Sequence, residues 1–429
     1  MKNVFSLFLV LLVSLAQGQN QKLPLLIGTY TNSCDSKGIY VYDFDTNTGD
    51  FVFKNATEKV INPSYLALSE DQKIVYSVNE NGSESTVSSF QFDSSSGKLI
   101  ELNQQKAQGA DPCYIINDDK NVIVANYSGG NIAVFGKNNN GSLTEAKQVL
   151  QHKGKGIHPR QGSAHVHMVY FSPDKKYVLS NDLGTDAVAI YEYHPNAGTE
   201  VLKLKSTVAV PSGSGPRHLT FSKDGKFVYL LQELNGALSV FNFANGQLHK
   251  IQETTILAKD FKGNFTGADI HVSPDGKFLY ASNRGEANTI SIFKVLKNGQ
   301  LKPQSVVSSL GKGPRNFAID PTGKFILVAH QYSNDVVVFN FPEGDTVINT
   351  PAYQSLVPFY QEARRIGNGD MNIGRQYILN DPDTYPLVIR PVDKRENYIK
   401  RCVAIAGDTL EVRGGQVYIN SQPGFNPPH

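Results

Sequence analysis

The chain has 429 residues, of which 19% are charged, and its formal net charge is +2 at pH 7. The sequence has neither a basic stripe for nucleic acid nor an acidic tail, so no nucleic-acid partner is expected. Three cysteines, Cys34, Cys113 and Cys402, stand at unrelated spacings. An odd number of this kind predicts neither a disulfide framework nor a zinc site, and we expect buried free thiols.

Residues 1–18 have the pattern of a secretory signal peptide. Lys2 supplies a positive charge, residues 4–15 form an apolar run, and residues 16–18 are the small-residue sequence Ala-Gln-Gly. The run is too short for a permanent transmembrane helix. We expect export to the periplasm or the extracellular space, with no stable membrane span after signal cleavage. A buried first strand is the alternative, which the lack of apolar–polar alternation disfavours.

The following 320 or so residues repeat one pattern: an apolar strand, a turn such as Ser-Pro-Asp-Gly-Lys, a second apolar strand, a polar turn and a third strand. The clearest copy spans residues 270–293. A period of about 40–50 residues with several short strands per unit is typical of a β-propeller. Seven units predict an all-β, seven-bladed propeller over residues 19–340; they open near Leu25, Asn62, Asp111, His165, Gly215, Gly267 and Gly313.

Residues that interrupt the repeat near the axis are candidates for chemistry, because the innermost strands and their loops line the central channel of a propeller. These candidates are His165, His167, Arg217, His218, Glu233, His271, Arg284 and Arg315. Clustered arginines fit an anionic ligand such as phosphate or carboxylate. Imidazole and carboxylate groups supply acid–base capacity near neutral pH. Glu233 follows an apolar strand, where a carboxylate is costly unless a cation meets it.

Each candidate has an alternative interpretation. His165 and His167 could form a metal-binding pair, but a third ligand at similar spacing is missing. His218 and His271 could be structural and hold the turn of the next blade. Glu80 has in the second unit the position that Glu233 has in the fifth, and is a lesser candidate. The sequence contains no Ser-His-Asp order, nucleophile elbow or P-loop.

Short motifs within the repeat are more specific than the repeat itself. They are Ile-Gly-Thr-Tyr-Thr at 27–31, Ala-Asn-Tyr-Ser-Gly-Gly at 125–130, His-x-His at 165–167, Asp-Leu-Gly-Thr-Asp at 182–186, Gly-Pro-Arg-His at 215–218, Glu-Leu-Asn at 233–235 and Asn-Arg at 283–284. With these motifs, residues 24 to about 340 resemble the seven-bladed lactonase family that includes propeller-type 6-phosphogluconolactonase and carboxy-cis,cis-muconate cyclase. The resemblance implies a catalytic site of His167, Arg217, Glu233 and Arg284. His165, His218, His271 and Arg315 are the expected substrate-binding neighbours.

The resemblance implies hydrolysis of a sugar δ-lactone to the aldonic acid, without a metal or an organic cofactor. Arg217 and Arg284 would hold the anionic substituent and the developing oxyanion. Glu233 or His167 would deprotonate the attacking water, and the other would assist the leaving ring oxygen. An exported chain would not meet a phosphorylated cytoplasmic metabolite. The alternatives are therefore another lactone outside the cytoplasm, or a non-catalytic propeller that binds a sugar acid.

Residues 341–429 do not continue the repeat. Tyr-Ile-Lys-Arg at 398–401, followed by Gly-Asp at 407–408, makes this part similar to the distal half of a bacterial type I signal peptidase. The general-base lysine of that family would be Lys400. The family's Ser-Met-x-Pro nucleophile box does not occur in this sequence, and a general base without its nucleophile has no acyl chemistry to perform. We interpret the tail as an inactive signal-peptidase remnant of a chimeric fusion; a β-rich accessory module is the alternative.

The fusion also affects the ring. The first unit begins without an inner strand of its own, and the resemblance implies that a C-terminal strand normally completes it. Because that segment is replaced here, we predict a poorly closed ring with an exposed sheet edge. The apolar run at residues 402–405 could substitute for the missing strand.

Overall fold

The computed structural model describes residues 22–32, 34–340, 410–413, 416–419 and 422–423. The predicted signal peptide at residues 1–18, Lys400, Cys402 and the run at 402–405 lie outside these residues. The chain divides into two units, Met1–Val357 and Pro358–His429. Of the cysteines within the described part, Cys113 is buried and free as predicted, whereas Cys34 is free but exposed, so the prediction was wrong for Cys34.

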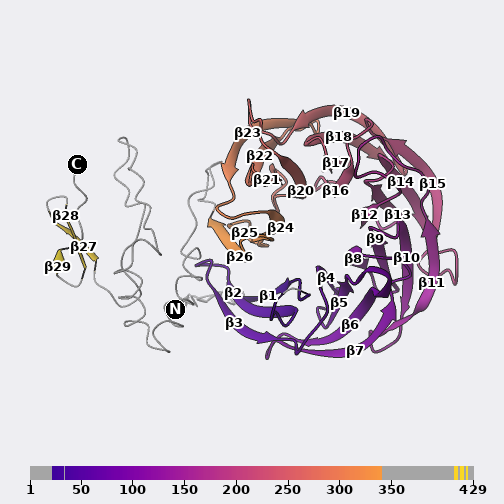
Figure 1. The fold of residues 1–429 in the computed structure, drawn as a ribbon, viewed down its shortest axis with the longest axis horizontal. Coiled ribbons are helices and arrows are strands. Elements are labelled where there is room, and N and C mark those ends of the chain that lie inside the picture. Colours follow the sequence, from indigo (N-terminus) through magenta and orange to yellow (C-terminus); the bar gives the residue numbers. More distant parts are fainter. Residues whose placement is uncertain (1–21, 33, 341–409, 414–415, 420–421, 424–429) are drawn as a thin grey trace, which may run out of the picture. The chain divides into compact units, whose positions relative to one another are not determined.

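The first unit is a propeller of seven antiparallel sheets around one axis (Figure 1). We number these sheets as blades one to seven in chain order. The seven blades confirm the predicted all-β, seven-bladed propeller. Blades one and seven have three strands each among the described residues, and the other five have four. In each four-stranded blade the first strand lies nearest the axis and the fourth on the perimeter (Figure 1).

The strands follow one another along the chain without crossovers. Blades one to three consist of β1 (Lys22–Gly28), β2 (Ile39–Asp45), β3 (Phe51–Ala56); β4 (Tyr65–Leu68), β5 (Ile74–Asn79), the 3-10 helix η1 (Gly82–Glu84), β6 (Thr86–Asp93), β7 (Lys98–Lys106); β8 (Pro112–Asn117), β9 (Asn121–Asn126), β10 (Asn131–Lys137) and β11 (Leu143–Gln151). Blades four to seven consist of β12 (Val166–Phe171), β13 (Tyr177–Asp182), β14 (Ala187–Tyr193), β15 (Leu202–Ala209); β16 (Pro216–Phe221), β17 (Phe227–Gln232), β18 (Ala237–Ala244), β19 (Gln247–Thr255); β20 (Phe265–Val272), β21 (Phe278–Gly285), β22 (Thr289–Val295), β23 (Leu301–Ser308); β24 (Pro314–Ile319), β25 (Phe325–His330) and β26 (Asp335–Asn340).

The second unit contains a small antiparallel sheet of β27 (Leu410–Arg413), β28 (Gln416–Ile419) and β29 (Gln422–Pro423). Within the described residues of both units, no helix has the length and apolar character needed to cross a membrane.

The turn between the first two strands of a blade is built by side chains of the repeat. In blade six the hydroxyl of Ser273 donates to the carboxylate of Asp275 at 2.5 Å and accepts the N–H of Phe278 at 2.9 Å. Gly276 has φ +79°, a backbone conformation that residues with a Cβ rarely adopt. The same serine–aspartate pair recurs in blades four and five, which explains why the repeat can be recognised in the sequence.

Replacement of Gly276 by Ala is expected to lower the free energy of unfolding by about 1–2 kcal/mol, because a Cβ destabilises the left-handed conformation. The added Cβ would also lie 3.1 Å from the Cβ of Lys223. Gly198→Ala is the matched control, since that Cβ meets nothing within 4 Å and Gly198 has no positive φ. Denaturant unfolding measures both variants, and equal effects would contradict the assignment.

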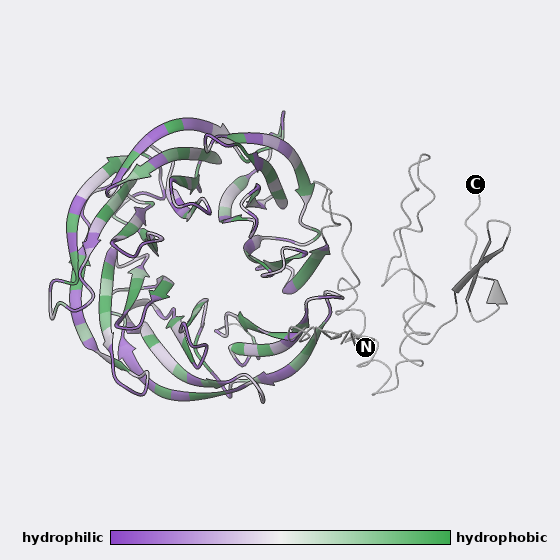
Figure 2. Ribbon diagram, turned by 180° about the vertical axis from the view of Figure 1, so that it is seen from behind, coloured by the Kyte–Doolittle hydropathy of each residue, from purple (hydrophilic) through white to green (hydrophobic). Residues whose placement is uncertain are grey.

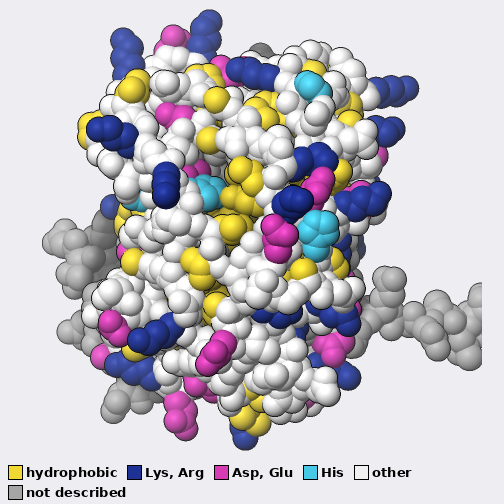
Figure 3. Space-filling model, turned by 90° about the vertical axis from the view of Figure 1, so that its right-hand side faces the viewer, with side chains coloured by type: hydrophobic (Ala, Val, Ile, Leu, Met, Phe, Trp, Pro, Cys, Tyr) yellow, Lys and Arg dark blue, Asp and Glu magenta, His cyan; other side chains and the backbone are white. Residues whose placement is uncertain are grey.

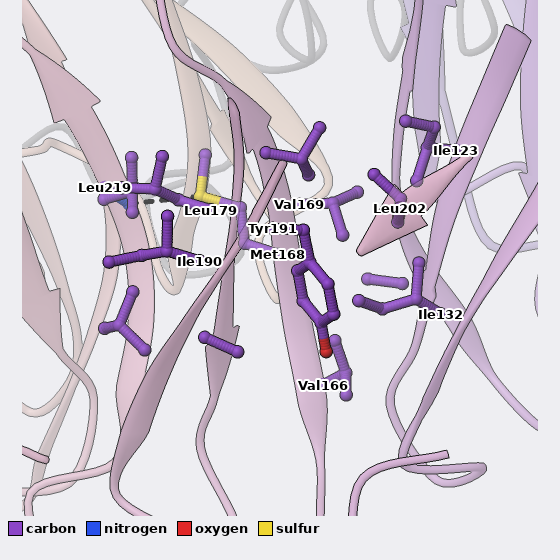
Figure 4. Close-up of a cluster of buried hydrophobic side chains, with 14 of the residues drawn as sticks. Ile123, Ile132, Val166, Met168, Val169, Leu179, Ile190, Tyr191, Leu202 and Leu219 are labelled. Atoms are coloured by element: carbon purple, nitrogen blue, oxygen red, sulfur yellow. Dashed lines mark hydrogen bonds between the residues drawn. The ribbon is translucent and has the colours of Figure 1, made fainter. Parts of the chain in front are cut away.

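The core lies between the blades. Its largest cluster includes Ile132 of blade three, Val169 and Leu179 of blade four, and Leu219 of blade five (Figure 4). Figure 2 shows the complementary pattern, with hydrophilic and hydrophobic segments alternating along the perimeter strands. Each blade therefore buries its faces only against its neighbours, so the ring folds as one domain.

Between blades one and seven lies an apolar hollow of about 450 Å³. Residues of β1 line one side of it, including Leu25 and Ile27, and Phe317 and Leu327 of blade seven line the other. Strand β1 pairs with β2 as β5 pairs with β6, so β1 has the role of a second strand. This agrees with the expected lack of an inner strand in the first unit; the poorly closed ring stays a prediction.

Candidate active site

A polar cavity of about 300 Å³ lies at the axis of the propeller. It is lined by Glu80, Asp111, Cys113, Tyr127, Ser128, Arg160, His167, Glu233, Arg284 and Arg315. These residues come from blades two to seven and their connections. Four of the eight residues predicted for the site are among them: His167, Glu233, Arg284 and Arg315.

The side chains that approach this cavity from the innermost strands share one backbone feature. The pairing of β12 with β13 shifts register between Val166 and Met168, which places His167 in a β-bulge. Corresponding shifts place Cys113, Arg217 and Arg315 in the bulges of β8, β16 and β24. A bulge leaves its extra residue outside the regular ladder and can turn the side chain in a new direction. The bulges therefore give these blades their irregular axial residues.

Glu233 is the charged centre of the site. It follows β17, and its backbone N–H donates to the carbonyl of Gly215 at 2.7 Å. Three guanidinium groups contact its carboxylate, at 2.6 Å from Arg160, 2.9 Å from Arg217 and 3.2 Å from Arg284. The expectation that cations meet this carboxylate is therefore fulfilled.

These arginines decide the ionisation of Glu233. Burial alone would raise its pKa, but the positive charges of Arg284, Arg217 and Arg160 outweigh burial and lower the pKa to about 2. Glu233 is therefore a carboxylate throughout the neutral range and a weak base. This environment suits an orienting anion better than a group that removes a proton from water.

His167 contributes an uncharged imidazole to the cavity. Its side chain is buried on β12, and Nε2 lies 4.0 Å from an oxygen of Glu233. Burial first, and then the positive charge of Arg217, lower its pKa well below the usual range. The imidazole is therefore neutral, with one unprotonated ring nitrogen. Beside it, burial raises the pKa of the Cys113 thiol, so Cys113 is present as a thiol rather than a reactive thiolate.

Arg217 lies behind the cavity wall. Its side chain is 2% exposed, it ion-pairs with Glu233, and it also donates to the carbonyl of Ala268. Arg284 lines the cavity while donating to the carbonyl of Gly267 at 3.2 Å. Of the two predicted anion-binding arginines, Arg284 is thus the one that the geometry offers to a ligand.

Three predicted substrate-binding histidines are not among the residues that line this cavity. His218 and His271 both contact the buried carboxylate of Asp269, at 2.8 Å and 3.0 Å. His165 stacks on the ring of Tyr127 with 4.6 Å between centroids. These contacts favour the structural alternative for His218 and His271, and a supporting role for His165.

Arg160 is a site residue that sequence reasoning missed. It lies in the connection between β11 and β12, outside the repeat, and besides Glu233 it contacts the hydroxyl of Tyr127 at 3.3 Å. The adjacent buried Gln161 anchors this loop by donating to the carbonyl of Leu183 at 2.8 Å. The only signal available was a cationic residue in an unusually long connection.

The clustering of arginines in the cavity differs from the charge pattern of the outer surface. On the side face drawn in Figure 3, basic side chains are scattered among acidic ones.

Comparison with known proteins identifies the family. Residues 24–350 match the family described as lactonase, 7-bladed beta-propeller. A 6-phosphogluconolactonase of Formosa agariphila is 36% identical over 73% of this chain and 91% of its own length. The 6-phosphogluconolactonase of Bacillus subtilis is 34% identical over 73% of this chain and 89% of its own.

A solved structure and a second family complete the comparison. The periplasmic gluconolactonase of Pseudomonas aeruginosa is 37% identical, with a TM-score of 0.72 over 76% of this chain and 94% of its own. Residues 321–427 match signal peptidase, peptidase S26, so both family matches include residues 321–350. From its propeller, the chain belongs to the lactonase family of seven-bladed β-propellers.

Proposed function

We propose that the propeller hydrolyses a sugar δ-lactone to the aldonic acid, as a 6-phosphogluconolactonase-like enzyme of the cell exterior or periplasm. The observation that carries the proposal is a neutral, buried imidazole, His167, beside a carboxylate that three arginines hold ionised. Relatives named as 6-phosphogluconolactonases, and a periplasmic gluconolactonase at 37% identity, support the substrate class and the location.

The chemistry divides among these groups. His167 accepts a proton from water as the water oxygen attacks the lactone carbonyl carbon. Arg284 and the half-exposed Arg160 line the cavity and offer N–H groups to the oxyanion or to an anionic substituent. Glu233 keeps these guanidinium groups in place, and Arg217 fixes Glu233 from behind. The base is therefore assigned to His167 and not to Glu233.

The full chain, assayed with gluconolactone and with its 6-phosphate, tests the proposal. Hydrolysis of either above the spontaneous rate is expected, and Arg284→Ala should lower kcat/KM by about 10²–10³-fold through loss of a charged donor. A larger loss for the phosphorylated lactone would assign Arg284 to the phosphate. Hydrolysis of neither lactone by the folded protein would favour a non-catalytic propeller that binds a sugar acid.

A further inference from the structure

A second glutamate, the half-buried Glu80, lines the cavity. Glu80 follows β5 in blade two, at the position of the repeat that Glu233 has after β17 in blade five. Both side chains line the same cavity. Their contacts differ, because no ion pair joins Glu80 to a cation among the residues that the structure describes, whereas Glu233 has three arginine partners.

Hydroxyl groups hold Glu80 in place. The phenol of Tyr30 donates to its two carboxyl oxygens at 3.1 Å and 3.3 Å, and the hydroxyl of Ser64 donates to Oε1. Tyr30 follows β1 and Ser64 precedes β4, so neighbouring blades fix the carboxyl from two sides. The arrangement orients Glu80 at the cavity wall without the charge pairing that would force it to ionise.

The charged and titratable groups around Glu80 come from three further elements. Arg315 reaches the cavity from β24, Asp111 from the connection before β8, and Cys113 from β8 itself. Burial raises the pKa of Glu80, and the hydrogen bonds from Ser64 and Tyr30 and the charge of Arg315 offset only part of that rise.

The surroundings of the two glutamates of this cavity therefore act on their ionisation in opposite directions. The pKa of Glu233 is lowered to about 2, while that of Glu80 is raised above its ordinary value. Two titratable groups in one site whose pKa values are pushed apart are the usual mark of an acid and an anion with separate roles. The leaving group of a lactone is an alkoxide, which needs a proton to depart at neutral pH.

We propose that Glu80 is a catalytic residue that gives its proton to the ring oxygen of the lactone, with Tyr30 and Ser64 as its positioning residues. The assignment rests on the proposed function. The water oxygen bonds to the carbonyl carbon while His167 takes one water proton. The bond between the carbonyl carbon and the ring oxygen then breaks, its electron pair stays on that oxygen, and the Glu80 proton completes the new hydroxyl. One proton passes from His167 back to Glu80 through solvent, so the net change is consumption of one water.

The test is the pH dependence of kcat/KM, measured with gluconolactone and its 6-phosphate. Activity should fall as pH rises, because Glu80 loses its proton above its pKa. Glu80→Gln should lower kcat/KM by about 10²–10⁴-fold and abolish this alkaline fall. Glu80→Asp should restore part of the activity and the fall. Glu192→Gln, on the perimeter side of blade four, should change neither.

Tyr30→Phe separates a catalytic from a structural role. It removes a hydrogen bond that lowers the pKa of Glu80, so the alkaline fall should move to higher pH. A folded Glu80→Gln variant with the rate and pH profile of the parent protein would overturn the role of Glu80 alone. A parent protein that hydrolyses neither lactone would instead overturn the proposed function, and the role of Glu80 with it.

Discussion

Replacing His167 with Asn is expected to lower kcat/KM for lactone hydrolysis by about 10²–10⁴-fold, the usual contribution of a general base. The amide is similar in size to the imidazole but cannot accept the proton of the attacking water. The loss should appear mainly in kcat, because Arg160 and Arg284 still line the cavity. Steady-state kinetics with both lactones, together with a melting curve, measures the effect.

His165→Asn is the matched control for this variant. His165 lies two residues away, stacks on Tyr127 and does not line the cavity as the described residues place it. Its replacement should leave kcat/KM within a few-fold of the parent value. Equal losses for the two variants, or an unchanged rate with His167→Asn, would show that the base has been assigned to the wrong residue.

Replacing Arg217 with Met is expected to lower the free energy of unfolding by about 3–5 kcal/mol, because removal of one partner of a buried ion pair leaves the other charge uncompensated. Arg160 and Arg284 remain on Glu233, which places the expected loss at the lower end of this range. Arg160→Met is the control, since that side chain is 43% exposed. Solvent screens the charge of this half-exposed arginine, so its loss should cost less than that of the buried Arg217. Denaturant unfolding measures both.

The same ion pairs predict an acid dependence of stability. The pKa of Glu233 is lowered to about 2, so its contribution is present above the ordinary glutamate pKa and is lost as pH falls toward 2. Arg217→Met should weaken this dependence, because one of the positive charges that lower the pKa of Glu233 is removed. If Arg217→Met and Arg160→Met are equally mild, the buried pair does not carry the stability assigned to it.

The fold could be predicted from the sequence because the residues that form the turn of a blade are neighbours in the chain. Ser273, Asp275 and Gly276 are read directly as a turn, and their contacts in the structure are local. The meeting of Glu233 with arginines was predictable for a different reason, namely the cost of a lone carboxylate after an apolar strand. Neither argument needs knowledge of the tertiary arrangement.

The features that could not be predicted depend on the direction of individual side chains and on contacts between residues far apart in the chain. Arg217 and His218 are adjacent, and the bulge in β16 decides that Arg217 meets Glu233 while His218 meets Asp269. A simple strand pattern contains no sign of this bulge. Arg160 lies in a connection that shares nothing with the repeat, so only the folded ring brings it to Glu233.

The axial bulges have a consequence for how such a propeller can change during evolution. His167, Arg217 and Arg315 each occupy the one position of the inner strand that the ladder does not hold in register. A substitution there alters the side chain presented at the axis while the neighbouring strand keeps its pairing and its packing face. Single exchanges at these positions can therefore change the ligand or the reaction while the strand pairing of the ring stays the same.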